Sequence, residues 1–310
     1  MKRWLTNGAK LAVSVGLIAY VLSRVDLGAV LVRVTALPVG VVALAFLCLL
    51  IQIPLAGWRW WRLSAILGYD LPLGRVVSFL HVGLFFNQVL PSGVGGDVLR
   101  IWLLRRHAAS VMAAVTCVLL DRLVGVAALV ILVACGLPAL YATAADPVAR
   151  LSVAVLVGLA VLGYGALLLL GGDVGRFLAA FRLLAPIRAI ASATRSLVVP
   201  ALGPVLAVSV ALHGLTVLAA WLLAGGLGLE VGFMTLAALV PPVFLLLVLP
   251  VSMAGWGVRE GALVVSLGFA GVAPADSVAL SLLLGFGMLA ASLPGGLVWL
   301  ALGRVRPEAG

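Results

Sequence analysis

The chain has 310 residues, of which 65% are hydrophobic and only 10% are charged, and its mean hydropathy is +1.30. Soluble domains carry about 25% charged residues, so this composition excludes a soluble protein and indicates an integral membrane protein. The 20 lysines and arginines outnumber the 10 aspartates and glutamates. In a membrane protein this excess reflects the positive-inside rule and contacts with anionic head groups, so no nucleic acid partner is expected.

The cysteines and histidines are too scattered to suggest a metal site. The cysteines lie in apolar segments without a CxxC spacing, which predicts small core residues rather than disulfides or metal ligands. The histidines lie in separate segments and are predicted packing residues, apart from the one beside Arg105 and Arg106, which is predicted to be solvated at the interface. Neither a cofactor nor a metal is expected. These residues are Cys48, Cys117, Cys135, His81, His107 and His213.

The first half of the chain alternates apolar runs with short basic or aromatic segments. Residues 11–22 form a short apolar run that flanking basic residues lengthen by snorkelling, and the lack of an A-x-A cleavage site predicts a retained helix rather than a signal peptide. Residues 37–57 predict a second span. It ends at residues 58–62, Trp-Arg-Trp-Trp-Arg, which is typical of an interfacial anchor. Residues 108–136 predict a further span.

The second half repeats this order of segments. Residues 151–170 predict a span, and the arginine-rich stretch 171–197 predicts an amphipathic helix on an anionic lipid surface. Another span is predicted at residues 198–227. The apolar region 231–269 is interrupted by prolines and glycines, and residues 278–302 predict the last span.

Two polar, glycine-rich stretches stand out in this apolar chain. Residues 87–100 read NQVLPSGVGGDVLR, and residues 248–260 read VLPVSMAGWGVRE. Both contain Val-Leu-Pro, followed by a glycine five residues after the proline and an arginine nine residues after it. Two such elements, one in each half, predict a duplicated polar site.

Charge counting predicts how these stretches lie in the membrane. Most lysines and arginines fall on the cytoplasmic side if the N-terminus is inside and residues 75–106 enter and leave from that side. Residues 231–275 then enter and leave from the outside. The predicted fold is an all-α polytopic membrane protein, a single transmembrane domain over residues 1–310. It has about six full spans plus two re-entrant half-helix hairpins, in an inverted repeat of about 1–150 and 151–310. Eight simple spans with proline kinks are the alternative.

Charged residues at membrane depth are expensive, at about 2.5–3.5 kcal/mol each on insertion scales, so they pair with one another or line a pathway. A half-helix starting near Gly96 would direct free N–H groups and a positive dipole end at the midplane, which suits a phosphate. Tight helix packing through small residues and a structural ion-pair network are the alternatives. The candidate substrate-binding residues are Asn87, Pro91, Gly93, Gly95, Gly96, Asp97, Arg100, Asp121, Arg122, Ser252, Gly255, Gly257, Arg259 and Glu260.

Five residues of this set have predicted roles. Arg100 and Arg259 are predicted to contact a phosphate in one shared cavity, with Asp97 and Glu260 holding these arginines, meeting a cationic group or carrying protons. Asn87 either binds a head group or ties the hairpin together.

Three motifs in this order resemble the transmembrane-domain family of lysylphosphatidylglycerol synthase. The resemblance covers nearly the whole chain and implies a flippase-like membrane domain that moves an anionic, aminoacylated or polyprenyl-linked lipid. The chain ends at Gly310 without a synthase domain, so any lipid-modifying activity is expected to be lost or to belong to a separately encoded partner enzyme. The motifs are Asn87-x-x-x-Pro91-x-Gly93-x-Gly95-Gly96-Asp97-x-x-Arg100, Asp121-Arg122-Leu123 and Pro250-x-Ser252-x-x-Gly255-x-Gly257-x-Arg259-Glu260.

The sequence therefore predicts a lipid flippase rather than an enzyme. It contains no P-loop, G-x-S-x-G, HExxH or paired-histidine spacing, so transport would draw on an ion gradient, downhill lipid flow or a partner. A non-transporting accessory subunit of a lipid-synthesis complex and an intramembrane lipid-modifying enzyme are the alternatives. The expected location is the cell membrane of a bacterium or archaeon, with the N-terminus cytoplasmic and membrane lipids as partners.

Overall fold

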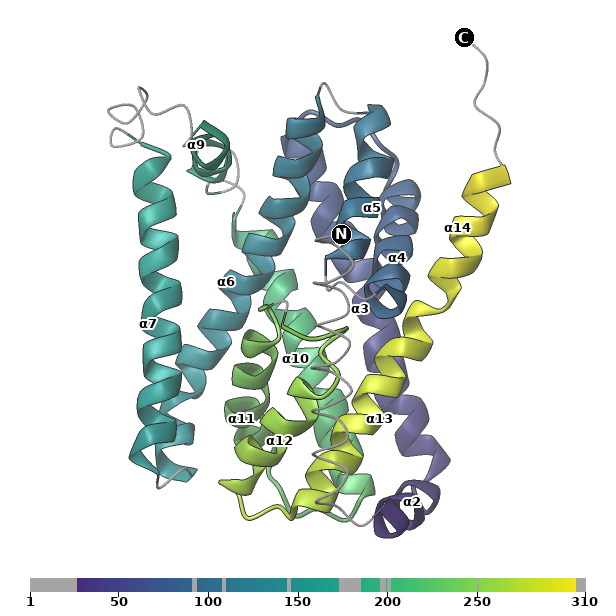
Figure 1. Cartoon of the computed structure of the whole chain (residues 1–310), viewed down its shortest axis with the longest axis vertical. Helices are drawn as coiled ribbons and strands as arrows, with labels where there is room; N and C mark the ends of the chain where they lie inside the picture. Colours follow the sequence, from purple (N-terminus) through teal and green to yellow (C-terminus); the bar gives the residue numbers. More distant parts are fainter. Residues whose placement is uncertain are drawn as a thin grey trace, which may run out of the picture.

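The structure, a computed structural model, describes residues 27–90, 94–107, 110–143, 146–172, 185–195, 199, 202–249 and 251–304. Over these ranges the chain is all-α (Figure 1). The predicted first span, residues 11–22, lies outside the described residues, as do Pro91, Gly93 and Pro250 of the two motifs.

Five stretches of the described chain are helical, long and apolar enough to cross a membrane, so this is a multi-pass membrane protein. They confirm the spans predicted after residue 30, although two helices run further than expected: α3 continues through residues 58–62 and α6 continues beyond residue 136. The five are α3 (Val39–Ile66), α6 (Val111–Thr143), α7 (Pro147–Leu170), α10 (Leu202–Gly226), and α13 (Pro274–Ser292) continuing into α14 (Pro294–Arg304).

Two pairs of shorter helices lie between these long ones. The first pair is α4 (Leu73–Val89) and α5 (Gly95–Leu104), and the second is α11 (Phe233–Leu246) and α12 (Val258–Gly268). At 1.5 Å per residue, α5 and α12 are each about 15–17 Å long, roughly half of a ~30 Å hydrocarbon layer. Figure 1 shows α4 and α5 in the upper half of the molecule and α11 and α12 in the lower half, so both breaks lie near mid-height.

The long helices α3 and α10 pack along each other and form the centre of the molecule. Each carries one of the short pairs, because α4 packs on α3 and α11 packs on α10. The main apolar core joins α3, α10, α11, α12 and α13, and a second core around Trp60 joins α3, α4, α5 and α6. Each short pair therefore lies beside this central helix pair.

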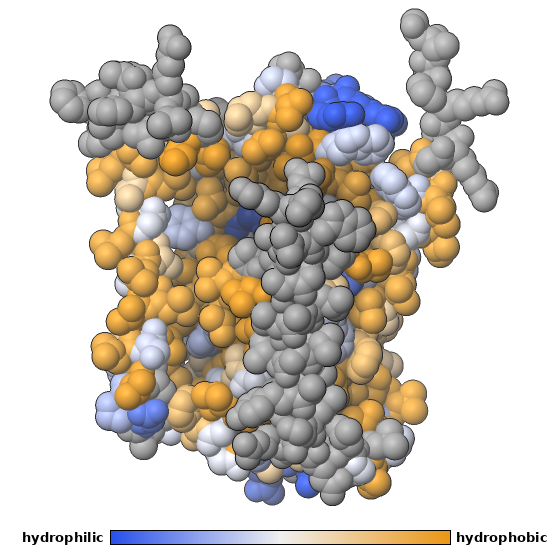
Figure 2. Space-filling view, viewed as in Figure 1, coloured by the Kyte–Doolittle hydropathy of each residue, from blue (hydrophilic) through white to orange (hydrophobic). Residues whose placement is uncertain are grey.

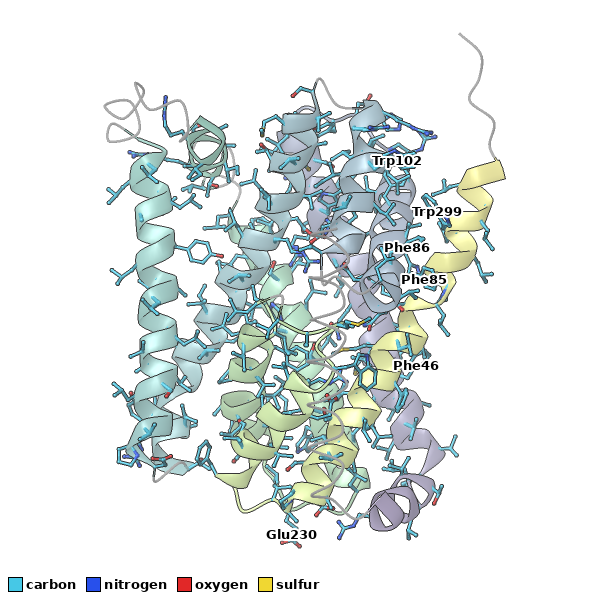
Figure 3. All side chains as sticks on the ribbon, in the orientation of Figure 1. Phe46, Phe85, Phe86, Trp102, Glu230 and Trp299 are labelled. Atoms are coloured by element: carbon cyan, nitrogen blue, oxygen red, sulfur yellow. The ribbon has the colours of Figure 1, made fainter. Side chains whose placement is uncertain are left out.

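The last helix, α14, closes the side of the first short pair. A Cβ atom on Gly295 would lie 2.2 Å from the carbonyl oxygen of His81, so α14 approaches α4 through a glycine. Above this contact, Phe86 and Trp102 pack on Trp299, with ring centroids 5.4 and 6.0 Å away (Figure 3). These aromatic contacts tie both helices of the first pair to the C-terminal helix.

The helix α7 stands at the edge of the bundle and packs on α6 and on α9 (Ala185–Ala193). Only 6% of its most apolar stretch is buried, which indicates a helix surrounded by lipid. The hydroxyl of Tyr164 donates a hydrogen bond to the carbonyl oxygen of Leu123 and links α7 to α6. Figure 2 shows a mostly hydrophobic surface, with strongly hydrophilic residues mainly near the upper and lower ends and a few in hollows between them.

Short helices lie at both ends of the bundle (Figure 1). At the upper end, α9 lies within the stretch predicted as an amphipathic surface helix, of which residues 173–184 and 196–197 are outside the described chain. At the lower end, α2 (Leu27–Thr35) packs on α13, and Arg33 forms an ion pair with Asp276.

Candidate functional site

Helix α5 begins in close contact with α4. The backbone N–H of Gly96 donates to Oδ1 of Asn87 at 2.8 Å, and a Cβ atom on Gly96 would lie 1.8 Å from the carbonyl oxygen of Gly83. Asn87 therefore ties the two helices together, the second of its two predicted roles. At Gly96 the structure shows the tight packing through small residues that was the alternative to a phosphate seat, and the Gly96 amide is already bonded.

A carboxylate on α6 holds two arginines from different helices. Asp121 accepts from Nε of Arg59 on α3 at 2.8 Å and from Nη2 of Arg100 on α5 at 2.7 Å, one arginine on each carboxylate oxygen. Asp121 and Arg100 are buried, with side chains 1% and 3% exposed. Arg59 also donates from Nη1 to the hydroxyl of Ser209 on α10 at 3.2 Å. These hydrogen bonds join four helices, α3, α5, α6 and α10. Buried ion pairs depend on such additional hydrogen bonds for their stability.

A second carboxylate, Asp97, extends the same network toward the surface. It accepts from Nε and Nη2 of Arg122 at 2.8 and 3.0 Å, and from Nη1 of Arg100 at 3.3 Å. The side chain of Arg122 is 49% exposed and that of Asp97 is 13% exposed. At ~1.5 Å per residue, Arg122 lies about 16 Å along α6 from Val111, well inside this candidate membrane span. A half-exposed guanidinium at this depth needs a polar partner.

The buried arginine of this network stacks on an aromatic ring. The guanidinium carbon of Arg100 lies 4.0 Å from the ring centroid of Trp60, and Gly83 leaves space for its methylene groups. Nε of Arg100 is buried without a hydrogen-bond partner. We call the charged residues here the first-half cluster. It contains three arginines and two aspartates and so carries one net positive charge: Arg59, Asp97, Arg100, Asp121 and Arg122.

Sequence reasoning missed two members of this site. Arg59 and Trp60 fall in the segment predicted as an interfacial anchor, and that prediction is wrong for both, since they are 9% and 1% exposed. The reason is that α3 does not end at residue 57 but continues to Ile66, carrying its buried face past these residues. The helical spacing of Gly57, Trp60 and Ser64 on that face was the available signal.

The second half contains a smaller cluster around Arg259. Its Nη2 donates to Oε1 of Glu260 at 2.8 Å and its Nε donates to Ser281 on α13 at 3.2 Å, while Ser281 donates to the same glutamate oxygen at 2.9 Å. Glu260 also accepts from the backbone N–H of Gly257. We call Arg259, Glu260 and Ser281 the second-half cluster. Its one cation and one anion are buried and balance each other.

The two clusters are built alike. Arg259 also stacks on a tryptophan, Trp256 at 4.6 Å, and Gly285 on α13 leaves it space as Gly83 does for Arg100. The turn before α12 depends on glycine, since Gly255 and Gly257 have φ values of 81° and 83°. The hydrogen bonds of Arg100 go to α5 and α6, whereas those of Arg259 go to α12 and α13. The convergence of both arginines on one cavity stays a prediction.

The remaining candidates lie apart from the clusters. Ser252 is buried in the turn before α12. His81 and His213 each lie 3.0 Å from a backbone carbonyl oxygen, of Ala291 and Gly125, which confirms them as packing residues. Cys48 and Cys117 are buried as predicted, but Cys135 is exposed on α6, where the prediction of a core residue is wrong. Across the described residues, no group of three His, Cys, Asp or Glu side chains is placed to hold a metal ion.

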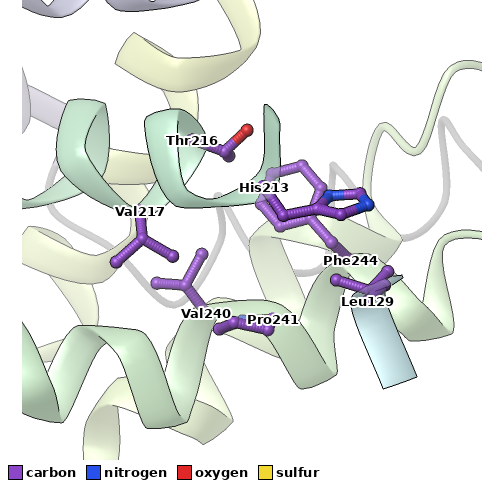
Figure 4. A pocket seen from close by; sticks show the side chains of 7 residues that line it. All are labelled: Leu129, His213, Thr216, Val217, Val240, Pro241 and Phe244. Carbon is purple, nitrogen blue, oxygen red and sulfur yellow. The ribbon is translucent and has the colours of Figure 1, made fainter. Parts of the chain in front are cut away.

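A small pocket lies beside His213, between α6, α10 and α11 (Figure 4). Its empty volume, which includes open solvent, is about 170 Å³. Its walls are mostly apolar, so it is not the predicted head-group site. The lining residues are Leu129, His213, Thr216, Val217, Val240, Pro241 and Phe244.

The described chain has five candidate spans, two pairs of shorter helices and two charged clusters. These features define a membrane protein with charged residues in its interior. The sequence model of a family described as the lysylphosphatidylglycerol synthase TM region matches residues 8–295. The match covers most of the chain, which therefore belongs to this family. Comparison with curated proteins and with solved structures gave no match.

Proposed function

We propose that this protein is a lipid flippase or transporter that moves a lipid with a phosphate-bearing head group between the two leaflets. The proposed substrates are anionic or aminoacylated phospholipids or polyprenyl-linked lipids, whose acyl chains stay in the bilayer during transport. The observation that carries this proposal is the first-half cluster, in which three guanidinium groups face two carboxylates at membrane depth.

The charge of the first-half cluster supports a binding role over a purely structural one. A structural ion-pair network has no reason to retain an unbalanced charge, because each charged residue costs about 2.5–3.5 kcal/mol at the membrane centre. The second-half cluster shows the balanced arrangement, with one arginine on one glutamate. An anion at the first-half cluster would remove the imbalance, and phosphate suits the planar forks of arginine.

We further propose that α4–α5 and α11–α12 are re-entrant hairpins that enter from opposite sides and form an inverted repeat. Three observations support this arrangement: the short lengths of α5 and α12, the positions of the pairs in opposite halves of Figure 1, and the shared Arg, Trp and Gly environment of the two clusters. Rocking of such repeats would open the site alternately to each leaflet.

The proposed orientation places the upper end of Figure 1 in the cytoplasm of a bacterial or archaeal cell. Arg75, Arg105, Arg106 and His107 are exposed around the ends of α4 and α5 at this end, as the positive-inside rule requires. The lower end carries Glu230, and Arg33 there is paired with Asp276 (Figure 3). A lipid-modifying enzyme encoded separately is the proposed partner.

Transport is favoured over intramembrane catalysis by how the carboxylates are used. Both oxygens of Asp121 accept from arginines, and so do both oxygens of Asp97. In the structure every oxygen of these two carboxylates is engaged by a guanidinium, so none is left free to contact a reacting group.

A proteoliposome exchange assay with tail-labelled lipids, with and without a pH gradient, tests the proposal. Wild-type protein should move an anionic phospholipid between leaflets without altering it chemically. Arg122→Gln should slow this exchange by about tenfold or more, because it removes the most accessible guanidinium of the site, a loss of ~1.4 kcal/mol or more.

Arg62→Gln is the matched control. Arg62 is exposed near the end of α3 and is not a member of the first-half cluster, so this variant should keep the wild-type rate. Folded wild-type protein that exchanges no anionic lipid would contradict the flippase proposal and leave the accessory-subunit role. Chemical conversion of the labelled lipid would instead establish an enzyme.

A further inference from the structure

We propose that Asp97 is an exchangeable counter-ion, which holds Arg122 in the structure and releases it to the phosphate of an incoming lipid. The charge of Asp97 then sets the head-group charge that the site accepts, and the preferred ligand is a singly charged phosphodiester. This inference rests on the proposed function, since it assigns a residue and a substrate class to the same transport site.

The two carboxylates of the first-half cluster differ in how firmly they are held. Asp121 is 1% exposed and bonded on both oxygens by arginines that are themselves buried. Asp97 is 13% exposed, and its main partner Arg122 is 49% exposed. Breaking a fully buried ion pair costs about 3–5 kcal/mol, because one charge is left buried without its partner. The pair that opens is therefore Asp97 with Arg122.

The geometry of this pair suits replacement by a phosphate. Arg122 donates through Nε and Nη2, at 2.8 and 3.0 Å, so the two oxygens of Asp97 occupy the fork of the guanidinium. Two oxygens of a phosphate bind an arginine fork in the same way. The incoming lipid can thus take over both donors of Arg122 while the arginine keeps its bidentate geometry.

Arg100 is a second guanidinium that favours anion binding here, and it is buried. Its contact with Asp97 is long, at 3.3 Å from Nη1, and its Nε is buried without a hydrogen-bond partner. A buried donor left unsatisfied costs about 1–3 kcal/mol. Each of the two non-bridging oxygens of a phosphodiester accepts more than one hydrogen bond, as Oδ1 of Asp97 does here, so one anion can bind Arg122 and still accept from Arg100.

Charge balance then selects the ligand. The first-half cluster has one net positive charge, which a phosphodiester neutralises. A phosphomonoester carries nearly two negative charges above its second pKa of about 6, so it leaves one uncompensated negative charge at membrane depth. The cluster therefore favours a diester over a monoester and over a neutral lipid, each of which leaves one uncompensated charge.

The second-half cluster offers no equivalent exchange. Glu260 is 2% exposed and accepts from Arg259, from Ser281 and from the backbone N–H of Gly257. Its carboxylate also caps the first turn of α12, so releasing it would free a helix terminus as well as an arginine. The exchangeable carboxylate belongs to the first half alone.

The test compares Asp97→Asn with Asp70→Asn in proteoliposomes at pH 8. Tail-labelled phosphatidylglycerol serves as the diester, phosphatidic acid as the monoester and a glycolipid as the neutral lipid. Asp97→Asn raises the cluster charge to two, so the ratio of monoester to diester exchange should rise by about tenfold or more. Asp70 is exposed in the loop between α3 and α4, so its variant changes the same charge without touching the cluster.

Two further variants keep the proposal testable if Asp97→Asn fails to fold. Asp97→Glu keeps the charge and should keep the wild-type preference. Arg122→Gln makes the cluster neutral and should abolish the preference for the diester over the glycolipid. A monoester-to-diester ratio that is the same in Asp97→Asn and Asp70→Asn would overturn the role of Asp97, even with active transport. A wild-type protein that moves none of the three lipids would overturn the proposed function itself.

Discussion

At the scale of single residues, the site depends on how buried arginines are neutralised. Asp121 is the centre of this arrangement, since it is bonded to both Arg59 and Arg100 and all three are buried. These partners come from segments 62 and 21 residues away in the sequence. Such pairings follow from tertiary packing, so the sequence could place Asp121 at membrane depth but could not predict that it binds Arg59.

Replacing Asp121 tests this role directly. Asp121→Asn leaves two buried guanidiniums without their shared anion, and breaking buried pairs of this kind typically costs about 3–5 kcal/mol. We expect a loss of that size in the free energy of unfolding, measured by denaturant titration in detergent. Arg59→Met in the same chain should recover part of it by removing one unpaired charge. An Asp121→Asn protein as stable as Asp70→Asn would show that the pairs contribute little.

At the scale of elements, the contact between α4 and α5 depends on two glycines. The prolines and glycines near residues 91–96 correctly predicted a break between two short helices. Hydropathy could not show how closely these helices approach, because that depends on the position of the Gly83 carbonyl group opposite Gly96. The same difficulty explains the wrong end predicted for α3, whose buried Arg59 resembles an interfacial residue when sequence alone is considered.

A single methyl group tests this contact. Gly96→Ala gains up to ~1 kcal/mol of helix propensity, but it places Cβ against the backbone oxygen of Gly83, and overpacking costs about 1–3 kcal/mol. Net destabilisation is expected, read as a lower midpoint of thermal unfolding in detergent. Gly74→Ala, on the exposed start of α4 with open space around it, should be neutral or stabilising. Equal midpoints for the two variants would argue against the close approach.

At the scale of the whole molecule, the two short helix pairs define the proposed topology. The spans after residue 30 followed from hydropathy and the prolines, and the family followed from three motifs. The relative placement of the two clusters could not be predicted from the sequence, because it depends on how α3 and α10 pack together. Re-entrant hairpins return to the side from which they enter, whereas kinked spans cross the membrane, so the two arrangements predict different sides for the flanking loops.

Cysteine labelling distinguishes these topologies. In a background without Cys48, Cys117 and Cys135, cysteines placed at Asp70 and His107 should react with a membrane-impermeant reagent from the cytoplasmic side of oriented vesicles. Cysteines at Glu230 and Gly271 should react from the opposite side. Labelling of positions 70 and 107 from different sides would show that α4 and α5 cross the membrane.

The unbalanced charge of the first-half cluster has a further consequence in an energised membrane. With three arginines and two aspartates, the cluster is cationic when free and neutral when it holds a phosphodiester. Moving one charge through 100 mV changes the free energy by ~2.3 kcal/mol. In the proposed transport cycle, the return of the unloaded protein, and not the passage of the lipid, is then the step that the membrane potential drives. Voltage could thus supply directionality to transport without ATP.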